Sequence, residues 1–192
     1  MRKPTYTKIF NLLAEQEKIY IQATGNEVFI ADGHILIRMP DWMYRTEFLE
    51  RDANSWPGSF PAVYPGECVT YDKHEIKEEG PDLHKMWCTF FDRACGRPAR
   101  LLEPMKHKGR KVQVFETRYD KVILNYKFYG AVRQATQTAA VYAGIRREPV
   151  WFYDDCEIWR SCFSAMVMPV NYSELGSPMG AILEKEEKQH EG

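Results

Sequence analysis

The chain has 192 residues, of which 44% are hydrophobic and 28% charged, so it can bury a core without disulfide or metal support. This composition excludes disordered, collagen-like and coiled-coil proteins. The 26 Lys and Arg residues against 27 Asp and Glu residues give a net charge of −1, which excludes a uniformly basic nucleic-acid binder. Any affinity for nucleic acid must therefore come from a local patch. Aromatic residues make up 14% of the chain, which favours strands and contact surfaces.

The sequence shows no pattern typical of a membrane helix or a signal peptide. No apolar stretch approaches the ~18 residues of a membrane helix, and residues 1–6 lack the apolar centre of a signal peptide. We therefore expect a cytoplasmic protein with no membrane partner. An odd number of cysteines favours reduced thiols over a disulfide framework; the five are Cys68, Cys88, Cys95, Cys156 and Cys162.

The first part of the chain predicts one helix followed by three strands. Apolar side chains recur at helical spacing over residues 4–17, and Pro4 suits a first turn. Turn signals at residues 24–26 and at Asp32-Gly33 then separate stretches of strand-like pattern. The predicted strands are residues 19–22, 28–30 and 35–37. We take residues 4–40 as a first half-unit.

Residues 41–104 differ in character from what precedes them. They are rich in proline and glycine and hold most of the histidines and cysteines. Residues 42–49 and 82–95 predict short helices, and we interpret the rest as loops and short extended pieces. We take this segment as a loop-rich insertion.

A second strand and helix pattern follows over residues 111–170, which we take as a second half-unit. Asn125 is a favourable N-cap for a predicted helix over residues 126–139. The tail, residues 184–192, is charged and typical of a solvated segment. The predicted strands are residues 112–115, 122–124, 140–145, 150–153 and 165–170.

Together these patterns predict an α+β fold in which two helix-plus-antiparallel-sheet half-units form a single domain over residues 1–192. The half-units should share one core, because neither can bury its apolar face alone. The residues that we expect in that core are Ile9, Phe10, Ile30, Leu36, Phe128, Val132, Val150 and Val167.

Four stretches resemble the sliding clamps of bacterial DNA polymerases. Residues 28–36, VFIADGHIL, resemble the ATDGHRLA strand turn of that family, although the Thr is missing and Ile35 replaces Arg. Residues 165–170, AMVMPV, resemble the last clamp strand. Asn125 to Tyr129 resembles the opening of a clamp helix, and Pro149-Val150 falls where clamps place Ser-Pro before a strand. Order and spacing agree over about half of the chain.

The resemblance implies a clamp-like domain that binds without catalysis, at DNA or on a DNA-processing complex. Bacterial clamps carry three such domains per chain and close a ring as dimers, whereas this chain has room for one. A single domain of this kind leaves sheet edges that a ring would pair. We therefore expect a homo-oligomer.

A dense basic stretch is the candidate binding site for nucleic acid or a partner. Its cations suit phosphate contacts, because each neutralised phosphate releases a counterion. Trp87, Phe90 and Phe91 lie close in sequence and could stack on bases. A solvated loop before a strand is the plainer explanation. The cations are Arg93, Arg97, Arg100, Lys106, Lys108, Arg110 and Lys111, opposed within the stretch only by Glu103.

Two further clusters are candidate metal sites, and we predict no metal and no cofactor at either. Cys68, His74, His84, Cys88 and Cys95 lack the paired spacing of zinc ligands. The second cluster consists of acidic residues that could hold Mg²⁺, but turns favour Asp for conformational reasons alone. These are Asp120, Asp154, Asp155 and Glu157, together with an Asp72, Glu75 and Lys77 arrangement that faintly resembles a nuclease motif.

The sequence holds no phosphate-binding glycine loop, nucleophile elbow or zinc-protease motif, so we predict no catalytic residues and no enzyme. Three hypotheses remain: a clamp-like binding protein acting at DNA, an inhibitor from a phage or mobile element that blocks a nucleic-acid enzyme, and a metal-dependent nuclease. The second would resemble the anti-CRISPR proteins and bind a nuclease ribonucleoprotein. Aromatic residues near the end of the repeat, such as Phe152, are candidates for exposed anchors, although a place in the core is the plainer interpretation for each of them.

Overall fold

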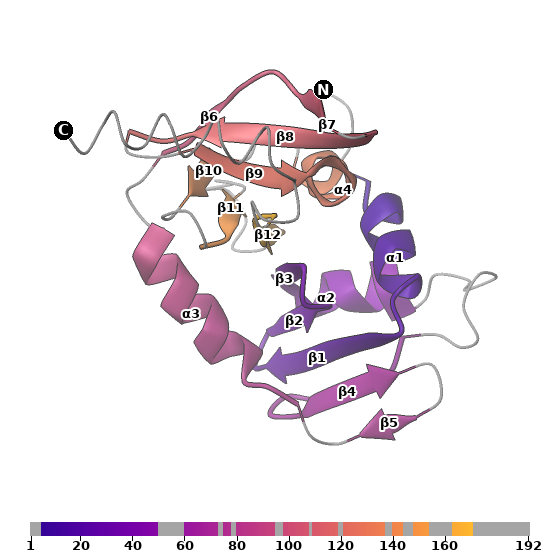
Figure 1. The fold of residues 1–192 in the computed structure, drawn as a ribbon. Helices are drawn as coiled ribbons and strands as arrows, with labels where there is room; N and C mark the ends of the chain where they lie inside the picture. Colours follow the sequence, from indigo (N-terminus) through magenta and orange to yellow (C-terminus); the bar gives the residue numbers. More distant parts are fainter. Residues whose placement is uncertain are drawn as a thin grey trace.

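A computed structural model shows antiparallel sheets flanked by helices (Figure 1), which confirms the predicted α+β class. None of the helices among the described residues is long and apolar enough to cross a membrane. The residues that the structure describes are 5–49, 60–72, 75–77, 80–94, 98–107, 109–118, 121–136, 140–143, 148–153 and 163–170.

The larger sheet has the strand order β10-β11-β12-β3-β2-β1-β4-β5, and all neighbours are antiparallel. It therefore combines strands from both ends of the chain with strands from the middle. The strands are β1 (Lys18–Thr24), β2 (Glu27–Ala31), β3 (Ile35–Pro40), β4 (Cys68–Asp72), β5 (Ile76–Lys77), β10 (Ala140–Ala143), β11 (Val150–Tyr153) and β12 (Ser164–Val167).

Six of these strands form two similar halves. Helix α1 (Thr7–Ala14) precedes the meander β1-β2-β3, and helix α4 (Tyr126–Ala135) precedes the meander β10-β11-β12. The halves join where β3 pairs with β12, with Ile35 opposite Val167. The two helices contact each other, and the apolar faces of both halves are buried in one shared core.

The first meander has turns that its sequence specifies. Gly25 adopts a φ of +54°, which suits the tight turn between β1 and β2. Asp32 precedes Gly33, whose φ is +88°. The Asp32 Oδ1 atom accepts hydrogen bonds from the backbone N–H groups of His34 and Ile35, both at 2.8 Å. This local bonding fixes where β3 begins.

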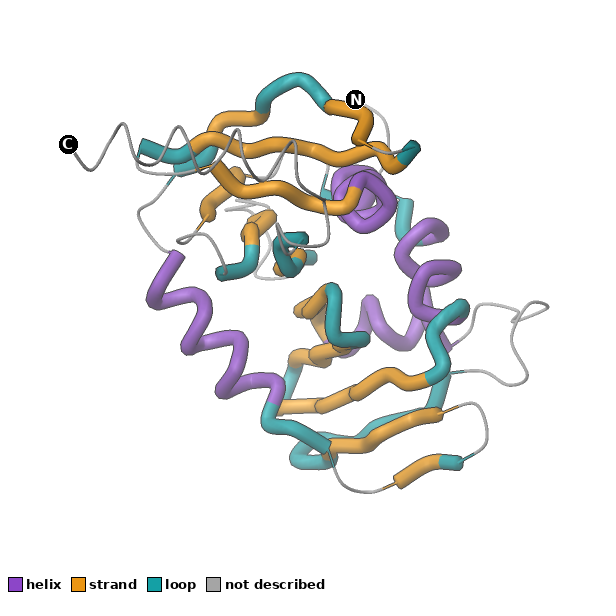
Figure 2. The backbone as a smooth tube through the Cα atoms, viewed as in Figure 1, coloured by secondary structure: helices purple, strands orange, loops and turns teal. Residues whose placement is uncertain are grey.

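The smaller sheet is built around β8 (Arg110–Glu116). One edge of β8 pairs with β6 (Arg100–Leu101) and β7 (Met105–His107), and the other edge pairs with β9 (Lys121–Asn125). Asn125 ends β9 and caps α4, because its side chain accepts a hydrogen bond from the Lys127 N–H at 2.9 Å. The sheet therefore leads directly into α4 (Figure 2).

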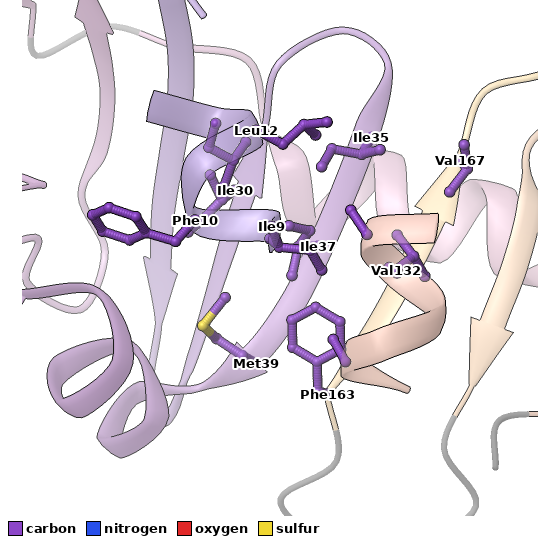
Figure 3. Close-up of a cluster of buried hydrophobic side chains, with 14 of the residues drawn as sticks. Ile9, Phe10, Leu12, Ile30, Ile35, Ile37, Met39, Val132, Phe163 and Val167 are labelled. Carbon is purple, nitrogen blue, oxygen red and sulfur yellow. The ribbon is translucent and has the colours of Figure 1, made fainter. Parts of the chain in front are cut away.

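The main core lies between the larger sheet and the two helices α1 and α4 (Figure 3). Ile9 of α1 and Val132 of α4 are fully buried against Ile30, Ile37 and Val167 of the sheet. Phe115 extends the core to the smaller sheet, since its ring lies 5.8 Å from that of Phe152.

Helix α3 (Leu83–Ala94) covers the opposite face of the larger sheet. Its buried Leu83 and Trp87 pack on Phe29, Leu36 and residues of β11 and β12. This helix comes from residues 41–104, which also supply α2 (Asp41–Tyr44) and a π-helical turn, Arg45–Leu49. Strands β4 and β5 of the same segment extend the sheet beyond β1. The segment that we expected to be a loop-rich insertion therefore contributes to both faces of the fold.

Most expected core residues are buried, including Leu36, which lies on the α3 face and not in the main core. One expectation was wrong. Phe128 is only partly buried, because α4 presents it to the turn before β3, where the His34 ring lies 4.8 Å away. Phe152 is fully buried between the sheets, so it is a core residue and not an exposed anchor.

One edge of the larger sheet, that of β10, has a neighbouring segment within the described part of the chain, and the other edge is formed by β5 and β4. Beside β10, the Ala99 N–H donates to the Val141 carbonyl at 2.9 Å, next to a Pro98–Tyr142 bridge. At the other end β4 covers β1, and only the two-residue strand β5 covers β4. The expected homo-oligomer stays a prediction, and the edge formed by β4 and β5 is where a second copy could pair.

Candidate nucleic-acid interface

The described cations of the basic stretch lie on one helix, α3, and on the three strands β6, β7 and β8. Arg100 lies on β6, while Lys106, Arg110 and Lys111 lie on the hairpin formed by β7 and β8. Gly109, with a φ of +78°, stands in the turn of that hairpin. Arg97 and Lys108 fall outside the described residues. Arg93 is described only as backbone in the last turn of α3. The structure thus groups three of the seven predicted cations on one hairpin.

Lys106 and Lys111 are direct cross-strand partners in this hairpin. Side chains directly opposite each other in an antiparallel pair lie on the same face, with Cβ atoms about 5 Å apart. Both lysines are exposed. No carboxylate among the described residues forms an ion pair with either lysine or with Arg110. The hairpin therefore carries two adjacent positive charges that its own described neighbours leave unneutralised.

Tyr126 lies against one of these lysines. The Lys111 Nζ atom is 3.7 Å from the centroid of the Tyr126 ring, which is a cation–π contact. Tyr126 begins α4, and its ring packs on the Tyr129 ring at 5.6 Å. Burial raises the pKa of Tyr129, with an opposing effect of Arg133. Sequence reasoning missed Tyr126, because only the pairing of β8 with β9 brings it to Lys111.

Arg100 has a different environment from the hairpin cations. Its guanidinium forms an ion pair with Glu116, its cross-strand partner on β8. The Arg100 side chain is 74% exposed, so the pair lies at the surface and contributes little stability. Its charge is nonetheless partly neutralised. Glu103, the one acidic residue within the stretch, forms no described ion pair with these cations.

The histidine and cysteine cluster does not assemble in the described part of the chain. The Cys88 Sγ atom lies 3.7 Å from His84 Nε2 on the exposed side of α3. The Cys68 thiol instead donates to the Pro81 carbonyl at 3.1 Å, and burial raises its pKa, helped by Asp82. His74 and Cys95 fall outside the described residues. Among those described, no three His, Cys, Asp or Glu side chains are grouped to hold a metal ion.

The nuclease-like arrangement lies on the hairpin of β4 and β5. Asp72 accepts the Glu75 N–H on its Oδ1 atom at 2.9 Å, which is a turn-forming contact. Glu75 also forms an exposed ion pair with Lys77 at 3.2 Å. The carboxylates are thus engaged in local structure. The acidic residues Asp120, Asp154, Asp155 and Glu157 fall outside the described residues.

The stretches that carry the clamp resemblance meet in space. The Met168 N–H donates to the His34 carbonyl at 2.8 Å, where β12 ends beside the start of β3. Phe128, from the third stretch, stacks near His34. Pro149 directly precedes β11, which pairs with β12. The sequence similarity therefore follows one contiguous part of the fold.

No family model matches the chain, and no curated protein matches it. A crystal structure from Eubacterium rectale, described as a “putative DNA polymerase III beta subunit”, is similar with a TM-score of 0.40 and 9% identity. The similarity covers 88% of this chain and 64% of that one, so this chain matches less than two thirds of its length. Membership of the clamp family therefore stays a prediction.

Proposed function

We propose that this chain is a non-enzymatic binding protein that contacts the phosphate backbone of nucleic acid through the β7–β8 hairpin. It would thereby act at DNA or on a DNA-processing complex in the cytoplasm. The observation that carries the proposal is the direct pairing of Lys106 with Lys111. Like charges placed directly opposite destabilise a hairpin. A bound phosphate would offset that penalty, because its negative charge lies between the two ammonium groups and attracts both.

Two features of the surroundings support this proposal. Arg110, beside the turn, adds a third exposed cation to the same hairpin. The chain as a whole has a net charge of −1, so no general positive field accounts for attraction to an anion. Binding by three such cations should depend on charge and not on base sequence, since phosphates carry no sequence information.

The test is the salt dependence of binding. Fluorescence anisotropy would follow a labelled 20-nucleotide single strand and a duplex of the same length between about 50 and 200 mM salt. Two phosphates, one between Lys106 and Lys111 and one at Arg110, predict a log–log slope of about −1.4 on the single strand and about −1.8 on the duplex, similar for unrelated sequences. Replacing Lys106 and Lys111 together with alanine should reduce the slope by about 0.7 to 0.9.

A matched control uses exposed lysines outside the hairpin. Replacing Lys8 of α1 and Lys85 of α3 with alanine removes the same net charge and should leave the slope unchanged. Equal effects of the two double variants on the slope would show that binding does not depend on where the lysines lie, and would overturn the assignment to this hairpin. No binding of either nucleic acid at about 50 mM salt would overturn the proposal itself. The inhibitor hypothesis, in which the hairpin contacts a protein, would then take its place.

A further inference from the structure

Resting on this proposed function, we infer that Tyr126 is a positioning residue for phosphate recognition. Its ring holds the Lys111 ammonium next to Lys106, so that the two ammonium groups bind one phosphate between them. The ligand class is therefore a single phosphodiester group, whose one negative charge is shared by two non-bridging oxygens that can each accept a hydrogen bond from one ammonium group. Arg110 lies on the other face of β8, so it would engage a separate phosphate.

The contact between Tyr126 and Lys111 has the geometry that this role requires. The Lys111 Nζ atom lies 3.7 Å from the ring centroid, within the range of a cation–π interaction. The ring itself is supported from behind. Tyr126 packs on Tyr129, and Tyr129 packs edge-on against Phe115 of β8 at 5.7 Å. A lysine side chain on a flexible stem is thus held by a partly buried ring that packs against the core.

The repulsion between Lys106 and Lys111 explains why the contact of Lys111 with the Tyr126 ring matters. Two opposed lysines repel each other, and each flexible side chain would turn away into solvent. Ring contact offsets that tendency for Lys111 and keeps its charge on the face that it shares with Lys106. With Cβ atoms about 5 Å apart, two ammonium groups can approach the same phosphate. Less side-chain freedom is then lost on binding.

The sharpest test changes the electronic character of the ring and keeps its shape. Position 126 would carry phenylalanine, then mono-, di- and trifluorinated phenylalanine, which progressively weaken the negative ring face. Affinity for a labelled 20-nucleotide single strand should be near wild type for Tyr126→Phe. It should then fall stepwise by about two- to fivefold in total, the size of an exposed cation–π contact. Thermal unfolding would verify that each variant is folded.

A second measurement covers the case in which fluorinated variants fold poorly. In a Lys111→Ala background, Tyr126→Leu should produce no further loss of affinity, because the ring has no ammonium to position. Additive losses would overturn the inference, as would unchanged affinity across the fluorinated series. Either result would leave the proposed function standing if the wild type binds and the Lys106 and Lys111 double variant shows the reduced slope. Failure of the wild type to bind would instead remove the proposed function, and this inference with it.

Discussion

Trp87 of α3 packs edge-on against Trp151 of β11, with ring centroids 4.8 Å apart and ring planes at 79°. Both side chains are buried. The contact attaches a helix from the middle of the sequence to strands near the end of the described chain, on the face of the sheet opposite α1 and α4. Stability of the larger sheet should therefore depend on this helix.

Replacing Trp87 with alanine should lower the free energy of unfolding by about 3–5 kcal/mol, because a large buried ring is lost and a cavity remains. Urea unfolding followed by circular dichroism would measure the change. Met86, which is 40% exposed on the same helix, provides the control, and Met86→Ala should cost well under half as much. Equal costs would show that α3 does not stabilise the sheet through Trp87.

The start of α3 predicts a response to acid. Asp82 Oδ1 accepts the Lys85 N–H at 2.9 Å, and this backbone hydrogen bond holds the Asp82 pKa below its ordinary value, helped by Gln22. A depressed pKa stabilises the folded state above the unfolded pKa of about 3.9, and this contribution is lost as the pH falls through the folded pKa. Asp82→Ala should therefore cost about 1 kcal/mol at pH 7 and less near pH 3.

Asparagine at position 82 separates the cap from its charge. Asp82→Asn keeps a side-chain oxygen for the Lys85 N–H and should retain most of the stability at pH 7. Its stability between pH 5 and pH 3 should fall less than that of the wild type, since the Asp82 titration is gone. Thermal unfolding at several pH values would measure both variants. A wild-type acid response identical to that of Asp82→Asn would contradict the assignment.

The lysine pair predicts a conflict between stability and binding. Lys106→Gln should raise the free energy of unfolding by about 0.2–1 kcal/mol at low salt, because it removes cross-strand repulsion. High salt should abolish the gain, because the repulsion is then screened. Lys8→Gln, a charge change on α1, should give no comparable gain. A variant that is more stable yet binds nucleic acid less tightly would show that the pair is maintained for its ligand.

The ion pair of Arg100 with Glu116 predicts a gain of binding. Glu116→Gln removes the charge that partly neutralises Arg100 and leaves the side-chain volume almost unchanged. Binding of the labelled single strand should tighten, and the log–log slope should steepen by up to about 0.7. Glu15→Gln, which disrupts an exposed ion pair with Lys127 away from this pairing, is the control. Equal tightening in both variants would indicate a general charge effect.

Local patterns predicted most elements correctly. Alternating apolar residues such as Ile19 and Ile21 identified strands, because successive side chains of a strand point to opposite faces. Asn125 identified the start of α4, since capping depends on neighbours in sequence. Strand β4 was missed, because its role comes from pairing with β1, and Tyr71 and Ile19 face each other only in the folded chain.

The sequence by itself determined where cations are dense, how helices and strands alternate, and which turns use glycine, because all of these depend on residues close along the chain. Tertiary structure decided which cations act together. Register places Lys106 opposite Lys111, β8–β9 pairing brings Tyr126 to Lys111, and Glu116 neutralises Arg100. These relations depend on which strands pair and with what offset. Pairing is selected by burial of the whole apolar face, which no short stretch encodes.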